Sequence, residues 1–370
     1  MPTLREAQLR HAAHHLRVVH AADTLYKQGY ADLEKALQMF NTNLANIRVA
    51  LLWSAEHFEE DENAAAVCSD FPNVGALLFE LVFAPVERFR WLACAVEAAR
   101  HLGDQNAEGW HIGNTGLVHL HVGDIGAAIR CFEQALIICR KFRDRTGEAR
   151  SFGNLGLAYK ELGEVKRAIE NYETALAIIE GTDDRRYLGG ILGNLGAACS
   201  ILGEHKRAIE YYRRDYEIAH EMGNLRGEAG VLNNISLVYV ATQDYPRAHR
   251  FAERSLGISR RIGDRIAEMG AINSFGLIYL NAGDPHKAVF CFDQMLAIAR
   301  EIEEWRGQAD AIFNKSLALA DLGDLEGAAV LGSKSLTLFQ QLRDPRIETI
   351  KEHLTVVHQR IRSFRSNVHS

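Results

Sequence analysis

The chain has 370 residues, of which 47% are hydrophobic and 24% charged, and its formal net charge is −6. This composition is typical of soluble proteins, and the acidic balance argues against a broad basic surface for nucleic acid. The sequence contains no run of about 18 apolar residues and no apolar leader, so we predict no membrane-spanning segment and a cytoplasmic location. The six cysteines form no C-x-x-C pair and are expected to be buried thiols.

Two long helices are predicted at the N-terminus, over residues 4–28 and 31–58. The first carries Arg-His-Ala-x-His-His-Leu at residues 10–16, and the second carries Asn-x-x-Asn-Ile-Arg-x-Ala-Leu-x-Trp at residues 43–53. Neither helix follows the period found in the rest of the chain. We therefore assign residues 1–64 to a separate N-terminal helical segment.

A 40-residue period begins after this segment. Residues 65–104 form a degenerate first repeat, in which Pro72 and Pro85 are expected to open the helices. Residues 345–370 are expected to form a polar capping helix to about residue 364 and a frayed tail from residue 362. Between them lie six full repeats, at residues 105–144, 145–184, 185–224, 225–264, 265–304 and 305–344.

The period is defined by residue types that return every 40 positions without drift. The longest column is Ala128, Ala168, Ala208, Ala248, Ala288 and Ala328, and an asparagine column contains Asn114, Asn154, Asn194, Asn234 and Asn314. A fixed period over six copies indicates an array of stacked repeats.

Each repeat is predicted to be a pair of antiparallel helices. In the second full repeat, Leu155, Gly156 and Tyr159 fall on one side of a first helix, and Ala168 and Tyr172 fall on one side of a second. The small residues allow the two helices to approach closely. The residues expected to cap the first helices are Asp144, Asp184, Asn224, Asp264 and Asp344. We predict an all-α solenoid of about fourteen to sixteen helices.

The order of aromatic, Leu-Gly, Tyr, Gly-acid, Ala, aromatic and Ala-Leu positions in these repeats resembles the tetratricopeptide repeat. The usual period of that family is about 34 residues, and a period near 40 also occurs in HEAT and armadillo repeats. The repeated Leu-Gly-x-x-Tyr and Ala-x-x-x-Tyr-x-x-Ala patterns favour the tetratricopeptide class. The resemblance implies a right-handed superhelix of antiparallel helix pairs.

The two N-terminal motifs, together with the repeats, resemble the sensor region of bacterial signal-transducing ATPases of the STAND (NB-ARC and MalT) type. No G-x-x-x-x-G-K-[ST] sequence occurs, so the ATPase motif is absent from this sequence. Two interpretations stay open: an excised sensor half, or a stand-alone relative. The 40-residue repeats are also similar to those of spindle-orientation adaptors of the Pins type.

A candidate binding surface follows from the first helix of each repeat, on the side opposite its packing face. In tetratricopeptide arrays this side lines a concave groove. Asparagine side chains both donate to and accept from a peptide main chain, whatever the sequence of the peptide. The candidate groove residues are Trp110, Asn114 and His121 in the first full repeat, Arg150, Asn154 and Leu157 in the second, Asn194 in the third, Asn234 and Leu237 in the fourth, Leu277 and Asn281 in the fifth, and Asn314 in the sixth.

Glycines also belong to this surface. The run from Gly189 to Gly196 is rich in glycine, and we expect these glycines to thin the groove so that a ligand can approach closely. The alternative for the asparagine column is a purely structural one, in which each carboxamide bonds the neighbouring helix and shapes the solenoid.

The function predicted from these features is a non-enzymatic scaffold, a sensor or adaptor that binds a protein or peptide. The alternative is a regulatory subunit that controls a partner enzyme, either a caspase-like peptidase or an ATPase. No catalytic constellation and no metal motif is found, so no cofactor, no metal and no nucleic-acid or membrane partner is predicted.

One repeat departs from the others. Asp215 lies where the other full repeats carry alanine, serine or methionine on the second helix. A carboxylate at a packing position costs free energy unless it is paired, and the candidate partners are Arg213, Arg214 or an arginine of a neighbouring repeat. The alternative is that the acid turns to solvent.

Overall fold

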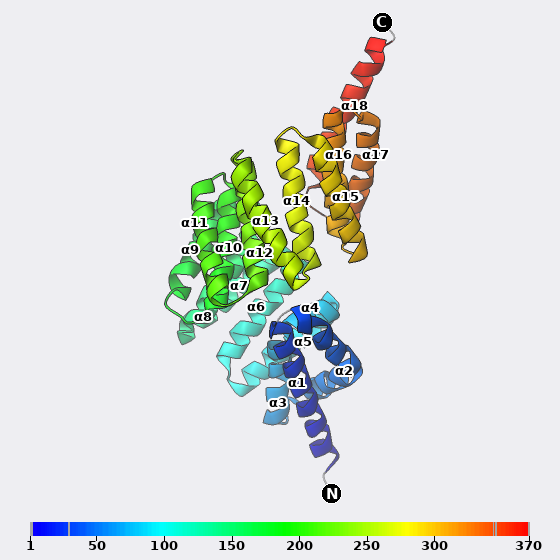
Figure 1. The fold of residues 1–370 in the computed structure, drawn as a ribbon. Coiled ribbons are helices and arrows are strands. Elements are labelled where there is room, and N and C mark those ends of the chain that lie inside the picture. Colours follow the sequence, from blue (N-terminus) through cyan, green and yellow to red (C-terminus); the bar gives the residue numbers. More distant parts are fainter. Residues whose placement is uncertain (1–2, 29, 343, 345, 369–370) are drawn as a thin grey trace. The chain divides into compact units, whose positions relative to one another are not determined.

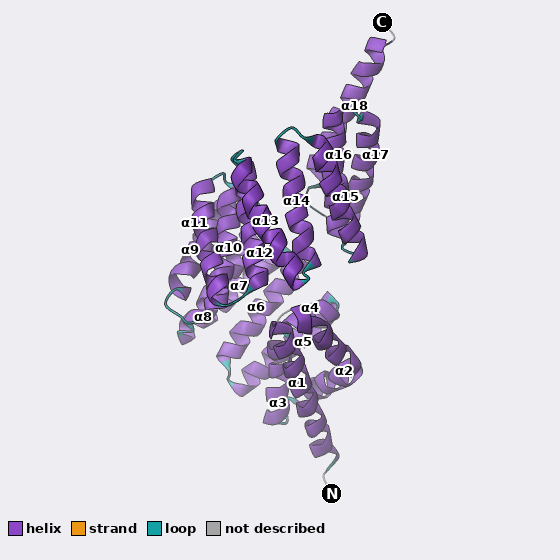
Figure 2. Cartoon of the chain, viewed as in Figure 1, coloured by secondary structure: helices purple, strands orange, loops and turns teal. Residues whose placement is uncertain are grey.

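The computed structural model describes residues 3–28, 30–342, 344 and 346–368, and these residues form eighteen helices and no strand (Figures 1 and 2). The all-α prediction is confirmed, whereas the predicted number of helices was too low. The helices are α1 (Leu4–Gln28), α2 (Tyr30–His57), α3 (Glu62–Val74), α4 (Ala76–Val82), α5 (Pro85–Leu102), α6 (Gln105–His121), α7 (Ile125–Phe142), α8 (Arg145–Glu161), α9 (Val165–Ile179), α10 (Arg185–Ile201), α11 (His205–Glu221), α12 (Leu225–Ala241), α13 (Tyr245–Ile262), α14 (Arg265–Asn281), α15 (Pro285–Glu301), α16 (Trp305–Leu322), α17 (Leu325–Gln341) and α18 (Ile347–Val368).

The helices belong to two compact bodies. The N-terminal body extends to Leu202 and contains α1 to α10, and the C-terminal body begins at Gly203 and contains α11 to α18. Within each body, helices that follow one another along the chain pack side by side, as expected for stacked helix pairs.

The first five helices build a common apolar core around aromatic side chains. Phe40, Phe71 and Phe79 are among its buried members. One of the helices beyond the predicted number arises here, because the first helix of residues 65–104 is divided at Gly75 into α3 and α4. A Cβ atom at Gly75 would lie 2.7 Å from Cγ1 of Val19 on α1, so this position tolerates only glycine at the observed separation.

Of the two prolines expected to open helices, only Pro85 does so. Pro85 lies at the start of α5, but Pro72 lies inside α3, near its C-terminal end. α3 begins earlier than predicted because Asp61 caps it, accepting a hydrogen bond from the backbone N–H of Asn63 at 2.9 Å. Pro72 therefore precedes the break at Gly75 instead of starting a helix.

The capping residues of the repeats behave as predicted. Asp144 accepts from the backbone N–H of Gly147 at 2.9 Å, and Asp184 accepts from that of Tyr187 at 3.0 Å. The turn inside each repeat needs a left-handed residue, and Gly163 supplies it with φ of +84°. Local sequence signals thus fix where these helices begin and end.

Glycines of the first helices receive aromatic rings from the second helices. A Cβ atom at Gly116 would lie 2.5 Å from Cε1 of Phe132, and one at Gly156 would lie 2.7 Å from Cδ1 of Tyr172. Where serine replaces this glycine, as at Ser236, the hydroxyl donates to the carbonyl of Ala248 at 2.8 Å. The two helices of a repeat therefore approach closely in two ways. In one an aromatic ring packs against a glycine, and in the other a serine hydroxyl bonds to a backbone carbonyl.

This packing makes a prediction with an internal control. Gly156→Ala is expected to lower the free energy of unfolding by about 1–3 kcal/mol, because the new methyl group meets the buried ring of Tyr172. Gly190→Ala, also inside a helix of the N-terminal body, has open space at its Cβ and should raise that free energy by about 0.5–1 kcal/mol. Urea unfolding measures both, and equal effects of the two variants would contradict the packing argument.

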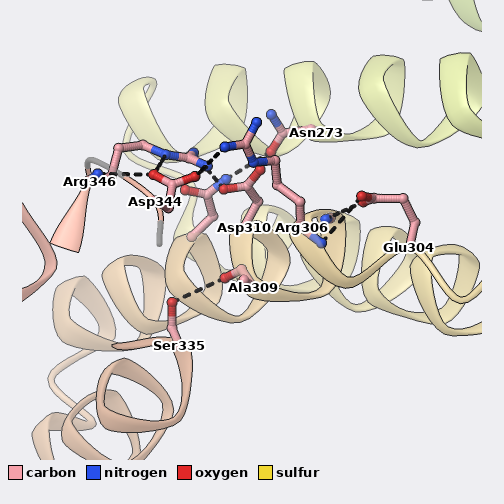
Figure 3. Close-up of polar contacts among 10 residues, drawn as sticks. Asn273, Glu304, Arg306, Ala309, Asp310, Ser335, Asp344 and Arg346 are labelled. Carbon is pink, nitrogen blue, oxygen red and sulfur yellow. Dashed lines mark hydrogen bonds and ion pairs between the residues drawn. The ribbon is translucent and has the colours of Figure 1, made fainter. Parts of the chain in front are cut away.

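Arginines connect the repeats of the C-terminal body through the capping aspartates. Nε of Arg226 lies 2.8 Å from Asp264, and Nη2 of Arg306 lies 2.7 Å from Asp344 (Figure 3). Burial opposes ionisation of Asp344, but the hydrogen bonds from Arg346 and the charges of Arg346 and Arg306 outweigh it and lower its pKa to about 2. These buried carboxylates therefore cap one helix and bind the preceding repeat at the same time.

The C-terminal helix is longer than predicted. α18 continues to Val368, whereas we expected fraying from residue 362; residues 369 and 370 lie outside the described part of the chain. Among the described helices, none by itself has the length and apolar character needed to cross a membrane. Only α3 and α4, which meet at a bend of 72°, reach that length and composition when they are counted together.

Candidate functional site

Four of the predicted groove residues line one pocket of the N-terminal body. Trp110, Asn114, Arg150 and Asn154 surround a cavity of about 860 Å³. Helices α6 and α8 supply these four side chains, and α4, α5 and α7 contribute further wall residues. The register that places them one repeat apart on the same side of successive first helices also brings them to one cavity.

Arg150 is held in place by aromatic rings and one carboxylate. Its guanidinium carbon lies 4.6 Å from the centre of the Trp110 ring and 5.3 Å from that of Tyr187. Its Nη2 lies 3.2 Å from Oδ2 of Asp184, the cap of the next repeat. The side chain is thus fixed by cation–π contacts and an ion pair before any ligand binds.

Several nitrogen atoms in the walls of this pocket are buried without a hydrogen-bond partner among the described residues. They are Nε1 of Trp110, Nδ2 of Asn114, Nε of Arg150 and Nη1 of Arg88. Buried donors are nearly always paired in folded proteins, and leaving one unpaired costs about 1–3 kcal/mol. A concentration of such donors around one cavity indicates a site where a ligand can supply the missing hydrogen-bond acceptors.

Arg88 was not among the predicted site residues. It lies on α5, in the register of the alanine column, where Ala128 and the five alanines that follow it are completely buried. Arg88 itself is only 8% exposed. Burial lowers the pKa of its guanidinium group, and the charge of Glu80 opposes this shift. An arginine in a column of alanines was the sequence signal that could have identified it.

The other predicted groove residues lie elsewhere. Asn194 and Leu157 are half-buried in the N-terminal body but do not line the pocket, and His121 is exposed at the end of α6. Asn234, Leu237 and Leu277 are half-buried in the C-terminal body, and Asn281 is exposed there.

Two of these asparagines bond to the protein itself. Asn314 donates from Nδ2 to Oδ1 of Asn273 at 2.8 Å, and Asn281 donates to the carbonyl of Leu277 at 2.8 Å. The carboxamide of Asn314 thus links α16 to α14, which is the kind of contact that the structural alternative for the asparagine column describes.

Cysteines and histidines do not form a metal site in the described residues, where no group of three or more potential ligands converges. Burial raises the pKa of Cys139, a pocket residue, to about 11, so its thiol is protonated at neutral pH. The thiol in this pocket is therefore not in the nucleophilic thiolate form.

Comparison with known proteins agrees with the sequence pattern. The family model of the tetratricopeptide repeat matches residues 106–181 and 187–261. These segments are therefore tetratricopeptide repeats, in a chain whose period is longer than the usual one of about 34 residues. No curated protein matches the sequence.

Solved structures share the fold at low sequence identity. Aspartyl phosphate phosphatase F from Bacillus subtilis is 12% identical over 80% of this chain and 75% of its own, with a TM-score of 0.61. A Rap protein complexed with Competence and Sporulation Factor is 15% identical over 96% and 98%, with a TM-score of 0.55. A STAND protein with a tetratricopeptide repeat sensor, from Pyrococcus horikoshii, is 15% identical over 94% of this chain and 55% of its own, also with a TM-score of 0.55.

Proposed function

We propose that this protein is a non-enzymatic scaffold that binds an extended protein segment along the first helices of its repeats. The observation that carries the proposal is the pocket of the N-terminal body, where Trp110, Asn114 and Arg150 present unpaired N–H groups around one cavity. Peptide main chains and polar side chains supply the acceptors that such donors need.

The biological setting that we propose is a role as the ligand sensor or as an adaptor in a signalling system of the STAND type. The N-terminal helices and repeats of this chain share their fold with a STAND protein that has a tetratricopeptide repeat sensor. A Rap protein of the same fold forms a complex with Competence and Sporulation Factor. These neighbours support a binding role, and control of a partner ATPase or peptidase is the alternative setting for the same surface.

A substitution that fills the groove tests this proposal. Gly190 is exposed on α10, and a Cβ atom there would meet nothing within 4 Å. Peptides selected from a random phage-displayed library on the intact wild-type chain serve as the ligand. Gly190→Trp is expected to weaken their binding at least about tenfold, which corresponds to about 1.4 kcal/mol, without lowering the melting temperature.

The matched control is Gly126→Trp, at an exposed glycine of the second helix α7, off the proposed surface. It should leave peptide affinity unchanged. If the two variants bind equally well, or if no peptide is selected by the wild-type chain, the proposed binding surface is wrong.

A further inference from the structure

Arg88 is a buried cation that the fold alone does not explain. Its side chain occupies a helix-packing position, yet its Nη1 has no hydrogen-bond partner in the described part of the chain and the residue lines the pocket. Glu80, the acidic group whose charge acts on it, also lines the pocket, and its side chain is exposed to solvent. A buried charge without a partner is strongly unfavourable, so the position makes physical sense if an anion enters the pocket.

The remaining walls favour one kind of anion. Asp104 and Asp144 also line the pocket, and each uses Oδ1 to cap a helix, accepting from the N–H of Ala107 at 3.0 Å and of Gly147 at 2.9 Å. Asp23 and Glu80 line it as well, so the walls carry four carboxylates. Their negative charges would repel a phosphate dianion more strongly than a carboxylate, which carries a single charge. The planar guanidinium group also matches the two oxygens of a carboxylate.

We infer that the pocket around Arg88 receives the carboxylate of an aspartate or glutamate side chain of the bound protein segment, with Arg88 as its ion-pair partner. The N–H groups of Trp110 and Asn114 lie in the walls of the same cavity and can donate to the same segment. The inference rests on the proposed function and adds to it the chemical class of the ligand.

The test uses the intact chain, a peptide selected on it, and the variant Arg88→Met, which keeps the length of the side chain and removes its charge. The selected peptides should share an acidic residue. Arg88→Met should bind such a peptide about 10- to 100-fold more weakly, which is the loss expected for one charge-assisted hydrogen bond. Replacing the glutamate of the peptide by glutamine should weaken binding to the wild type by a similar factor, and should add little in the variant.

Arg90→Met is the matched control, since Arg90 lies on the same helix and is exposed, with its guanidinium group over the ring of Trp91. It should bind the peptide like the wild type. Without ligand, Arg88→Met should melt at the same temperature as the wild type or higher, because it removes an unpaired buried charge. A lower melting temperature would instead assign Arg88 a structural role and overturn the inference.

The outcomes separate the inference from the proposed function. Peptide binding that Gly190→Trp blocks but Arg88→Met leaves unchanged would overturn the acidic-ligand inference and leave the groove intact. Competition by inorganic phosphate that exceeds competition by acetate at equal ionic strength would overturn the choice of a carboxylate. Failure of Gly190→Trp to block the selected peptides would overturn the groove itself.

Discussion

Replacing Asn114, Asn154 and Asn194 together by alanine is expected to weaken peptide binding at least about a hundredfold while leaving the fold nearly unchanged. Each carboxamide lost leaves an acceptor or donor of the ligand unsatisfied, at about 1–3 kcal/mol, and three such losses exceed the roughly 2.7 kcal/mol that a hundredfold change requires. All three asparagines are half-buried in the N-terminal body, and Nδ2 of Asn114 has no partner among the described residues. Each substitution should therefore lower the free energy of unfolding by only about 0.5 kcal/mol.

Isothermal titration calorimetry with a selected peptide measures the affinity, and urea unfolding measures the stability. Asn171→Ala is the control, because Asn171 lies on the second helix α9 and donates to the carbonyl of Arg167 at 2.8 Å. A triple variant that unfolds more easily, and whose binding falls only in proportion to unfolding, would assign these asparagines the structural role seen at Asn314.

Asp215→Ser is expected to stabilise the protein by about 2–4 kcal/mol at about pH 8. Burial raises the pKa of Asp215 to about 7, from an ordinary value near 3.8, and no arginine contributes to the shift. Among the described residues, Asp215 therefore has no ion pair with Arg213, with Arg214 or with an arginine of a neighbouring repeat. Ionising a carboxyl group that resists ionisation costs about 1.4 kcal/mol per pKa unit.

The sign of the pH dependence follows from the raised pKa. The contribution of Asp215 to the stability of the wild type is most favourable below about pH 4, where the residue is protonated in both folded and unfolded chains, and it becomes less favourable as the pH rises toward 7. The advantage of Asp215→Ser should therefore be absent below about pH 4 and complete above about pH 7. Serine is a natural choice, since Ser255 holds the same register and donates to the carbonyl of Ala229 at 2.8 Å.

The control for this prediction is Glu217→Ser, at an exposed acidic residue of the same helix. Its effect on stability should change little over the same pH range. A constant difference between wild type and Asp215→Ser from pH 4 to pH 8 would contradict the raised pKa.

The sequence by itself determined the repeats and the ends of their helices. The alanine and glycine columns recur every 40 residues because the two helices of each repeat pack closely at the same position. The capping aspartates accept hydrogen bonds from backbone N–H groups only three residues further along the chain. Such short-range chemistry can be recognised in the linear order of residues. The division of the first helix of residues 65–104 could not be, because Gly75 is required by the approach of Val19, which lies far away in the sequence.

The tertiary structure decided which of the predicted groove residues gather at one site. Trp110, Asn114, Arg150 and Asn154 line the same pocket, whereas the identical register gives Asn314 a partner in Asn273. Arg88 stands out in the sequence as an arginine in a column of alanines, but its importance depends on the missing partner and on the cavity beside it. Hydrogen-bond satisfaction and burial are properties of three-dimensional surroundings, so residues that share one position of a repeat can have different chemistry.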